Sequence, residues 1–485
     1  MTGRWGDVIS ISFWLLKNLK IKLMLPCSPK MFACSIAVMA AALLFCIQPV
    51  QAQTLEVSDN GRYLTRHDGT PFFWLGDTAW ELFHRLDREE ATRYLKNRAE
   101  KGFTVIQAVV LAELNGLTSP NPYGDLPLHQ NDPAQPNEAY FEHVDFIVDK
   151  AEELGLYIGM LPTWGDKFDR KWGVGPEIFT PSNARRYGSF LGERYKDEPI
   201  IWILGGDRNP ETDQHLAIIH AMAEGIQQGD EGKHLMTYHP QGESSSAQWF
   251  HDAQWLDFNM FQSGHARKNN RNYQINLSNY RKSPVKPTLD GEPCYEDHPI
   301  YWEPENGWFH AFDVRQAAYW SMLAGAMGHT YGNHNIWQMW EPGREPVSSA
   351  RTPWYEALDY PGAFQMKYLK ALFLARPFTR MVPNQDLVAK DLLQNTAPAR
   401  AAIARDNSFA VIYIPHGQDL EVELSMFNNS IVEARWYNPR MGESIMLKKF
   451  KAQSVHHFDP PADPKRGNDW VLVIDKEEAG YPPIH

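Results

Sequence analysis

Apolar runs and helical segments alternate eight times along the chain, and this alternation limits the possible folds more than any other feature. Each apolar run is short and nearly continuous, which is typical of a parallel strand buried on both faces. The predicted strands cover residues 71–80, 104–113, 156–165, 200–209, 234–240, 257–265, 286–296 and 329–338. The predicted helices cover 88–102, 139–155, 183–198, about 212–227, 247–255, 275–281, 314–327 and 357–374.

Eight strand–helix units in about 320 residues predict a (β/α)₈ barrel, which we place at residues 53–379. A doubly wound open sheet is the competing fold. The barrel is favoured because the count is eight and because no Gly-rich phosphate-binding turn follows the first strand.

From about Arg380 the pattern changes to short alternating runs separated by Asn, Gly and Pro. This pattern predicts a C-terminal antiparallel β-sandwich at residues 380–485. We expect Trp436, Tyr437 and Trp470 in its core, and a structural role for the domain. Sugar binding by these aromatic residues is the alternative.

The N-terminus predicts export. Residues 31–52 combine a preceding Lys30, an apolar stretch and small residues before a cleavage site after Ala52, as in a signal peptide. Residues 1–23 read as an upstream extension. We therefore expect a periplasmic or extracellular protein, with no membrane span in the mature chain.

Cysteine usage fits this interpretation. Cys27, Cys34 and Cys46 lie in the segment that would be removed, so the mature chain keeps only Cys294 and can form no internal disulfide. The sequence has no Cys/His cluster at metal-ligand spacing. We expect neither a metal nor a cofactor.

The charge and the aromatic content limit the classes of molecule that the protein can bind. The formal net charge of −12 argues against nucleic acid, because nothing would neutralise the phosphates. The chain has 17 Trp and 20 Tyr, and flat aromatic faces can stack on sugar rings. A Trp-rich core would give the same composition. The sequence leaves the oligomeric state open.

In a barrel of this kind, functional side chains project from the carboxyl ends of the strands. These ends carry two candidate catalytic carboxylates, Asp207 after strand four and Glu292 after strand seven. They also carry candidate substrate-binding residues: Asp77, Trp80, Trp164, Tyr238, His239, Gln262, His334 and Trp337. Polar and aromatic side chains of this kind predict a sugar-binding pocket.

Glycoside hydrolysis needs two carboxyl groups, one as an acid and one as a nucleophile or base. Strands four and seven lie nearly opposite each other in an eight-strand ring, so Asp207 and Glu292 can face a sugar from two sides. Carboxylates at these two strand ends resemble those of the retaining barrel glycosidases. That resemblance implies that Asp207 is the acid/base and Glu292 the nucleophile.

Structural roles compete with each of these interpretations. Asp207 could cap the next helix or pair with Arg208, and Glu292 could pair with a nearby cation. Asp77 could be a catalyst, although we expect it to bind substrate. Three other acids are less well placed: Glu113, Asp166 and Asp290.

Four blocks of the sequence, in order, resemble one known family. RYLTRHDGTPFFWLGDTAW…FTVIQAVVL, IIWILGGDRNPE, KPTLDGEPCYED and YGNHNIWQMW are similar to blocks of the apiosidase-like glycoside hydrolases, family 140. The tail resembles the collagen-binding-type β-domain that usually follows this barrel. The resemblance implies a retaining endo-acting hydrolase that releases apiose-linked side chains from the pectin rhamnogalacturonan II, a plant cell-wall polysaccharide.

Two alternatives remain open at this stage. One is a glycosidase of the same fold with another specificity, such as a rhamnosidase or a galactofuranosidase. The other is a non-catalytic polysaccharide-binding protein, which the presence of both carboxylates disfavours.

Overall fold

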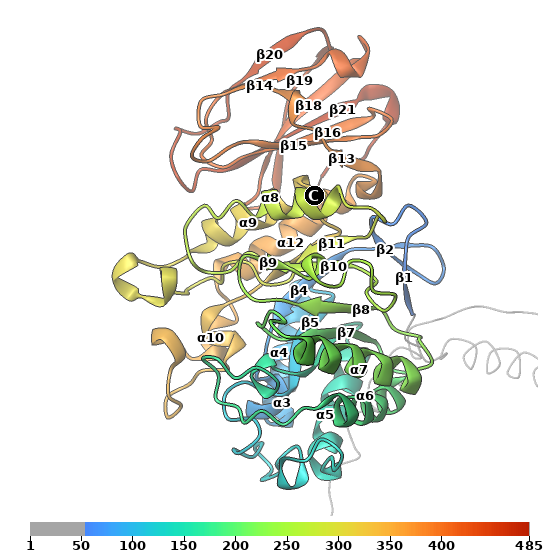
Figure 1. Ribbon diagram of the computed structural model, residues 1–485. Coiled ribbons are helices and arrows are strands. Elements are labelled where there is room, and N and C mark those ends of the chain that lie inside the picture. Colours follow the sequence, from blue (N-terminus) through green and yellow to red (C-terminus); the bar gives the residue numbers. More distant parts are fainter. Residues whose placement is uncertain (1–53, 485) are drawn as a thin grey trace, which may run out of the picture. The chain divides into compact units, whose positions relative to one another are not determined.

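The computed structural model describes residues 54–484, and a barrel of eight parallel strands forms its larger part (Figure 1). The strands are β4 (Trp74–Thr78), β5 (Val105–Leu111), β6 (Tyr157–Thr163), β7 (Ile200–Gly205), β8 (Met236–His239), β10 (Asn259–Gln262), β11 (Thr288–Asp290) and β12 (Gly328–Tyr331). Each lies within one of the eight predicted strands or, for β12, begins one residue before it. The predicted fold class is confirmed.

Strand pairing runs around most of the barrel. Six strands pair in parallel in the order β12-β4-β5-β6-β7-β8, and β10 pairs in parallel with β11. Single backbone bonds bridge the two remaining gaps. The amide of Asp257 donates to the carbonyl of Met236 (2.9 Å), and the amide of Met327 donates to that of Thr288 (3.0 Å). The eight strands therefore follow one another around a ring.

Along each strand, side chains point alternately into and out of the barrel, and so form two apolar layers. On β5, Val105 and Val109 belong to an inner cluster, whereas Ile106 and Val110 pack in an outer cluster with Tyr94 of the first long helix. Successive side chains of a strand point to opposite faces. Because both faces of these strands are covered by apolar groups, the strands read as continuous hydrophobic runs.

Helices cover the outside of the strands (Figure 1). The long ones are α4 (Arg88–Glu100), α5 (Glu138–Glu153), α6 (Pro181–Tyr195), α7 (Asp213–Gly229), α8 (Asn272–Tyr280), α9 (Ala311–Leu323) and α12 (Pro361–Leu374). Short ones are α3 (Leu82–Arg85), α10 (His334–Trp337) and α11 (Trp354–Ala357). Side-chain caps start several of them; Asp87 and Glu90, for example, form a capping box at α4.

The helix predicted at 247–255 is wrong. Only a single 3₁₀ turn, Ser246–Gln248, forms there. Ser245 Oγ accepts the amide of Ala247, and Ser246 Oγ accepts the amide of Met260. The local bond at Ser245 competes with helix formation, and the bond from Met260 ties the turn to β10.

A small antiparallel sheet precedes the barrel and was not predicted. Its strands are β1 (Leu55–Val57), β2 (Leu64–Arg66) and β3 (Pro71–Phe72). The first predicted strand, 71–80, thus divides into β3 and β4. A two-residue strand, β9 (Ser244–Ser245), adds to the edge of β10.

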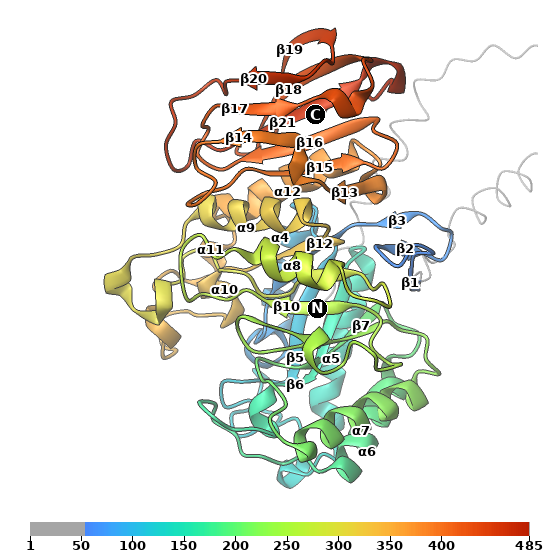
Figure 2. The ribbon, with the colours of Figure 1, turned by 45° about the horizontal axis from the view of Figure 1, so that its top comes forward.

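The C-terminal strands form an antiparallel domain of two sheets, seen from another side in Figure 2. One sheet has the order β13-β15-β16-β21-β18-β19 and the other β14-β17-β20. Their bounds are β13 (Met381–Pro383), β14 (Val388–Asp391), β15 (Arg400–Ala404), β16 (Phe409–Ile414), β17 (Leu420–Glu423), β18 (Ile431–Asn438), β19 (Glu443–Lys451), β20 (Val455–Phe458) and β21 (Trp470–Lys476).

The two faces of the larger sheet have different partners. Trp436 and Trp470 lie between the sheets, as predicted. Tyr437 does not: it points from the opposite face, and its hydroxyl donates to the carbonyl of Tyr368 on α12 (2.8 Å). A one-residue step along a strand turns the side chain to the other face, which explains the difference.

Buried ion pairs fasten this domain to the barrel. Arg315 of α9 contacts Asp469 (2.6 and 2.9 Å), and Arg376 contacts Asp475 (2.6 and 2.8 Å). Each pair is bidentate, which fixes direction as well as distance.

The predicted signal peptide and three of the four cysteines lie outside the described residues. Cys294 is a buried, unpaired thiol. Within residues 54–484, no helix has the length and apolar character needed to cross a membrane.

Candidate active site

A cavity of about 650 Å³ lies at the carboxyl ends of the barrel strands. Six of the predicted site residues line it: Trp80, Trp164, Asp207, Gln262, Glu292 and Trp337. Both candidate catalytic carboxylates are therefore in one cavity.

A sharp turn after β7 presents Asp207. Gly205, Gly206 and Asp207 all have left-handed backbones, with φ of 93°, 104° and 55°. A Cβ on Gly205 would lie 2.5 Å from the carbonyl oxygen of His239, so only glycine fits there. Three successive left-handed residues are uncommon, and such conformations concentrate at functional sites.

Arg208 anchors the turn more than it neutralises Asp207. Its guanidinium donates to the carbonyls of Asp169 (2.8 Å), Arg170 (3.0 Å) and Asp207 (2.8 Å). It lies 3.5 Å from the Asp207 carboxylate. Burial and the charge of Glu292 raise the pKa of Asp207 to about 7, although Arg208 opposes this shift. Asp207 thus holds its proton close to neutral pH.

Glu292 is surrounded by hydrogen-bond donors. The Tyr295 hydroxyl donates to Oε1 (2.6 Å), His265 Nε2 lies 3.2 Å from the same oxygen, and His239 Nε2 lies 3.0 Å from Oε2. Trp80 Nε1 in turn donates to the Tyr295 hydroxyl (3.1 Å). Burial raises the pKa of Glu292, but the contacts with His239 and His265 outweigh it and lower that pKa to about 2. Glu292 is therefore ionised.

Asp77 is a correction to the prediction, since its side chain does not line the cavity. Its carboxylate is buried, accepts from Tyr94 Oη (2.5 Å) and pairs with Arg98 Nε (2.5 Å). Both partners belong to α4, outside the barrel. Alternation along β4 turns Asp77 towards this helix and Thr78 towards Gln107 in the interior. Asp77 fastens α4 to the sheet.

Tyr238 and His334 also lie behind the cavity wall. The Tyr238 hydroxyl donates to the carbonyl of Arg208 (2.5 Å), and its ring packs on Phe250. His334 Nε2 contacts the carbonyls of Val347 (3.1 Å) and Ser348 (3.0 Å), two residues that line the cavity. These side chains support the wall and do not face a substrate.

His239 lies below the cavity, next to the carboxylates. Besides its contact with Glu292, its Nδ1 lies 3.3 Å from the amide of Asp207. The structure thus places it where it orients both acids, a different role from the predicted sugar contact.

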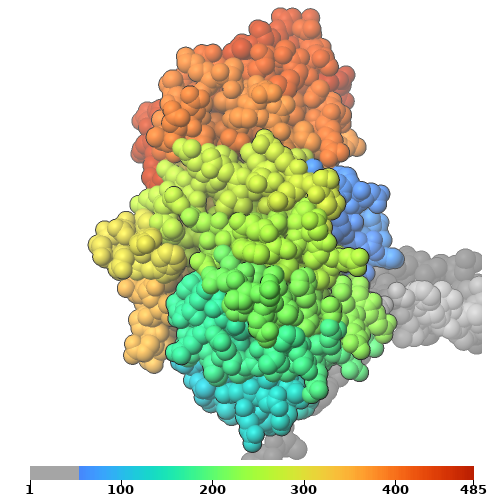
Figure 3. Space-filling model, in the orientation of Figure 1, coloured from blue at the N-terminus to red at the C-terminus, as the bar shows by residue number. Residues whose placement is uncertain are grey.

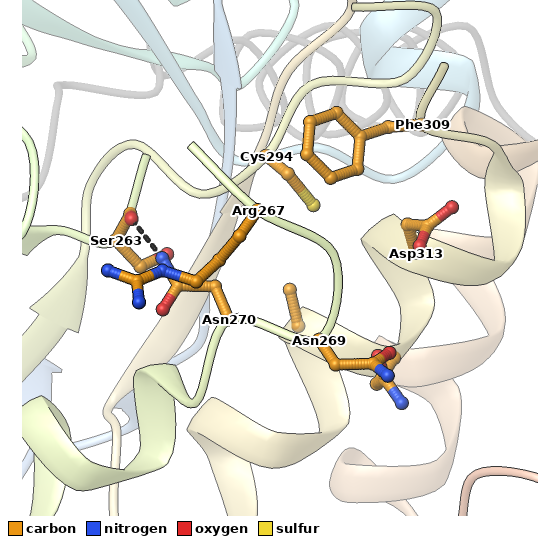
Figure 4. A pocket seen from close by; sticks show the side chains of 9 residues that line it. Ser263, Arg267, Asn269, Asn270, Cys294, Phe309 and Asp313 are labelled. Atoms are coloured by element: carbon orange, nitrogen blue, oxygen red, sulfur yellow. Dashed lines mark hydrogen bonds between the residues drawn. The ribbon is translucent and has the colours of Figure 1, made fainter. Parts of the chain in front are cut away.

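The loop after β10 carries His265 and is fixed from behind. Ser263 Oγ donates to Asp290 Oδ2 (2.7 Å), which also accepts from Asn272 Nδ2 (3.0 Å). Asn270 donates to the carbonyl of Ser263, drawn as a dashed line in Figure 4. Asp290 therefore supports the loop that holds His265 against Glu292.

Several cavity residues were missed by the sequence argument. His265 and Tyr295 were visible as polar residues at or just after strand ends six and seven. Glu113 was seen but ranked low, yet it lines the cavity. Burial and the charge of Asp207 raise the pKa of Glu113 well above its usual range. Others stand on long loops that carry no periodic signal: Trp172, His298 and Trp302.

No three or more His, Cys, Asp or Glu side chains within residues 54–484 are grouped so that they could hold a metal ion. The cavity brings together Asp207 with a raised pKa, Glu292 with a lowered pKa, a third buried carboxyl at Glu113 and several indole rings. This arrangement can donate a proton from one side and an electron pair from the other.

Residues 58–380 match the family described as "Apiosidase-like, catalytic domain". The chain belongs to this apiosidase-like family. Residues 382–475 match a second family, "Putative collagen-binding domain of a collagenase". A comparison with curated proteins gave no match. Neither family description gives the number 140, which stays a prediction.

Solved structures agree with the family. One described as a glycoside hydrolase is 37% identical, with a TM-score of 0.81 over 89% of this chain and 99% of the other. Another, a glycoside hydrolase family 5 protein from Bacteroides vulgatus, is 36% identical, with a TM-score of 0.82 over 90% and 96%. A third structure from that organism, at 15% identity and a TM-score of 0.65, shares the fold alone. This apiosidase-like protein is a glycoside hydrolase.

Proposed function

We propose that this glycoside hydrolase acts with retention of configuration, with Asp207 as acid/base and Glu292 as nucleophile, on apiose-linked side chains of rhamnogalacturonan II. The observation that carries the proposal is the opposite pKa displacement of two carboxyl groups in one cavity: about 7 at Asp207 and about 2 at Glu292. Where the surroundings of two carboxyl groups push their pKa values apart, the group with the raised pKa can act as the acid and the ionised group as the nucleophile.

In the first step, Asp207 donates its proton to the glycosidic oxygen while Glu292 attacks the anomeric carbon. The bond between that carbon and the leaving oxygen breaks, and a glycosyl ester forms on Glu292. Tyr295 and His265 hold the attacking oxygen in place, and Trp80 holds Tyr295.

In the second step, Asp207 is ionised and takes a proton from water. The water attacks the anomeric carbon, the ester bond to Glu292 breaks, and Asp207 regains its proton. Two displacements at the same carbon restore its original configuration.

The substrate part of the proposal is supported by membership of the apiosidase-like family and by an open, aromatic-lined cavity. A polymer with branched side chains can reach such a cavity from solvent.

The test is incubation of residues 53–485 with rhamnogalacturonan II, beside D207A and E292A, with products read by mass and anomeric configuration read by proton NMR. Release of an apiose-ended oligosaccharide of retained configuration by the wild type alone supports the whole proposal. Rhamnosides and galactofuranosides are tested in parallel. Cleavage of one of these in place of apiosides contradicts the substrate, and an inverted product contradicts the mechanism.

Export completes the proposed function, because the polysaccharide is too large to enter a cell. The supporting feature is the signal-peptide pattern at residues 31–52. Cell fractionation and N-terminal sequencing should find an exported chain that begins at Gln53. A cytosolic chain that retains residues 31–52 would contradict export.

A further inference from the structure

Two tryptophans differ from all others that the structure describes. Trp172 is 57% exposed and Trp302 is 47% exposed, and both line the catalytic cavity. Trp80, Trp164 and Trp337, which also line it, are each at most 7% exposed. Thus, within residues 54–484, the exposed indoles occur only at this cavity.

Trp172 is held on a fixed loop after β6. Its ring lies over the Arg208 guanidinium, 4.1 Å from the ring centroid, and Arg208 is itself clamped to the carbonyls of Asp169 and Arg170. The amide of Gly175 donates to Asp166 (2.7 Å), which closes the loop. A cation therefore contacts the indole, while the residue as a whole stays exposed.

Trp302 is presented by a strained backbone. Tyr301 and Trp302 are both left-handed, with φ of 57° and 61°, which is a genuine outlier for bulky residues. The amide of Tyr301 donates to the carbonyl of His265 (3.0 Å), and the Trp302 ring meets the ring of His298 edge-on. The loop that carries them, yellow in Figure 3, stands out from the side of the face shown. Strain of this kind persists only where the surrounding contacts enforce it.

The two rings come from opposite sides of the barrel mouth. Trp172 follows β6 and Trp302 follows β11, the third and seventh strands of an eight-strand ring. Trp172 lies beside the Asp207 turn through Arg208. Trp302 lies on the side of Glu292, near its partner His265. The leaving group departs from the side of the acid, and the cleaved sugar stays with the nucleophile.

We infer that Trp172 and Trp302 are two sugar-stacking platforms, Trp172 for a sugar of the leaving group and Trp302 for a sugar attached beyond the cleaved residue. This inference rests on the proposed function and deepens it. The substrate class is a branched glycan that occupies both sides of the broken bond, and a terminal monosaccharide is a poor substrate. A cavity of about 650 Å³ has room for more than one sugar ring.

The test compares two substrates that share the cleaved sugar. Apiosyl fluoride has no sugar on either side, whereas an oligosaccharide from rhamnogalacturonan II has sugars on both. For W172A and W302A, kcat/KM on the oligosaccharide should fall about three- to tenfold more than on the fluoride, which is the worth of one aromatic stacking contact. W172F and W302F, which keep a ring, should recover part of the loss.

Y301A is the matched control, because Tyr301 is 60% exposed, has the same backbone conformation and does not line the cavity. It should show no such difference between substrates. Equal losses of kcat/KM on both substrates in W172A and W302A, or no loss at all, would overturn the assignment of Trp172 and Trp302 as sugar-stacking platforms.

If the wild type cleaves neither apioside, the apiose assignment fails, and the platforms are then tested by binding. Retention of pectic polysaccharides by E292Q in affinity electrophoresis should weaken at least threefold when W172A or W302A is added. Unchanged retention, or retention of no polysaccharide by E292Q itself, would overturn the inference.

Discussion

The ends of β7 and β11 place the same functional group in two different surroundings. Asp207 stands on a left-handed turn, and its nearest cation, Arg208, is directed mainly at backbone carbonyls. Glu292 is contacted by a tyrosine hydroxyl and two histidines. Desolvation acts on both carboxyls, but only at Glu292 do enough donors face the charge to reverse it.

On the proposed assignment of roles, the difference teaches that an acid and a nucleophile need not differ in chemistry. What assigns the role is the number of donors directed at the carboxylate, together with the charge of its neighbour. Once Glu292 is ionised, its negative charge adds to burial in keeping the proton on Asp207. The two roles are therefore coupled, and a change at Glu292 should alter the pKa of Asp207.

The largest effect is expected from E292A. Without the nucleophile, kcat on any cleavable glycoside should fall by at least about 10⁴-fold, as when a group that bonds to the substrate is removed. Steady-state kinetics measure this loss. E296Q is the matched control, since Glu296 is buried four residues further on but contacts Tyr331 and the amide of Gly362. A comparable loss in E296Q would show that the effect is structural.

The next effect is expected from D207A, and it depends on the substrate. Loss of general acid catalysis should lower kcat/KM about 10²–10⁴-fold on an oligosaccharide. With apiosyl fluoride, whose leaving group needs no proton, the first step should be nearly normal, and added azide should restore turnover with a product of retained configuration. Equal losses on both substrates would show that Asp207 is not the general acid. An azide product of inverted configuration would show that Asp207 is the nucleophile.

A smaller effect is expected from Y295F. This change removes the 2.6 Å hydrogen bond to Glu292 Oε1 while keeping the ring. A hydrogen bond to a charged group contributes about 1.5–3 kcal/mol, so kcat should fall roughly 10- to 100-fold. Stopped-flow measurement of the first step should show the loss there. If kcat is unaffected, Tyr295 does not hold the nucleophile.

The pH dependence tests the coupling between the two acids. Because Asp207 must be protonated, kcat/KM should decline as pH rises through about 7. In E292Q the negative charge that raises the pKa of Asp207 is gone, so that pKa should fall below 7. Carbon-13 NMR of labelled aspartate in both proteins measures the shift. An unchanged pKa in E292Q would break the proposed coupling.

The smallest effect concerns stability. The pKa of Asp207 in the folded chain is about 7, above its unfolded value, so the folded state binds more protons and loses stability as pH rises from about 4 to 7. D207N removes this cost and should raise the free energy of unfolding by about 1–3 kcal/mol above pH 7. Thermal melting at pH 4 and pH 8 should show a gain only at pH 8. A gain of the same size at both values would refute a charge effect.

Much of this arrangement could be predicted from the sequence. The eight strands are continuous apolar runs, and Asp207 and Glu292 stand directly after two of them, so their approach follows from barrel geometry. The prediction failed where a shift of one residue along a strand decides which way a side chain points. Asp77 and Tyr238 stand at strand ends too, yet alternation turns both outwards, Asp77 to Arg98 of α4 and Tyr238 to Phe250.

Other features carried no local signal at all. Trp172 and Trp302 lie in long irregular loops, and their positions depend on contacts with Arg208 and His265 that are distant in sequence. The pKa of Glu292 likewise depends on His239 and His265, which reach the site from β8 and from the loop after β10. The hydrophobic periodicity of the sequence does not predict tertiary contacts of this kind.

The most direct test of the central claim is to trap the covalent intermediate. D207A incubated with apiosyl fluoride should accumulate a glycosyl ester, because no base remains to activate water for the second step. Mass spectrometry of its proteolytic peptides should find the sugar on Glu292. A sugar on Glu113 or another residue, or turnover to an inverted product with no adduct, would contradict the division of roles between Asp207 and Glu292.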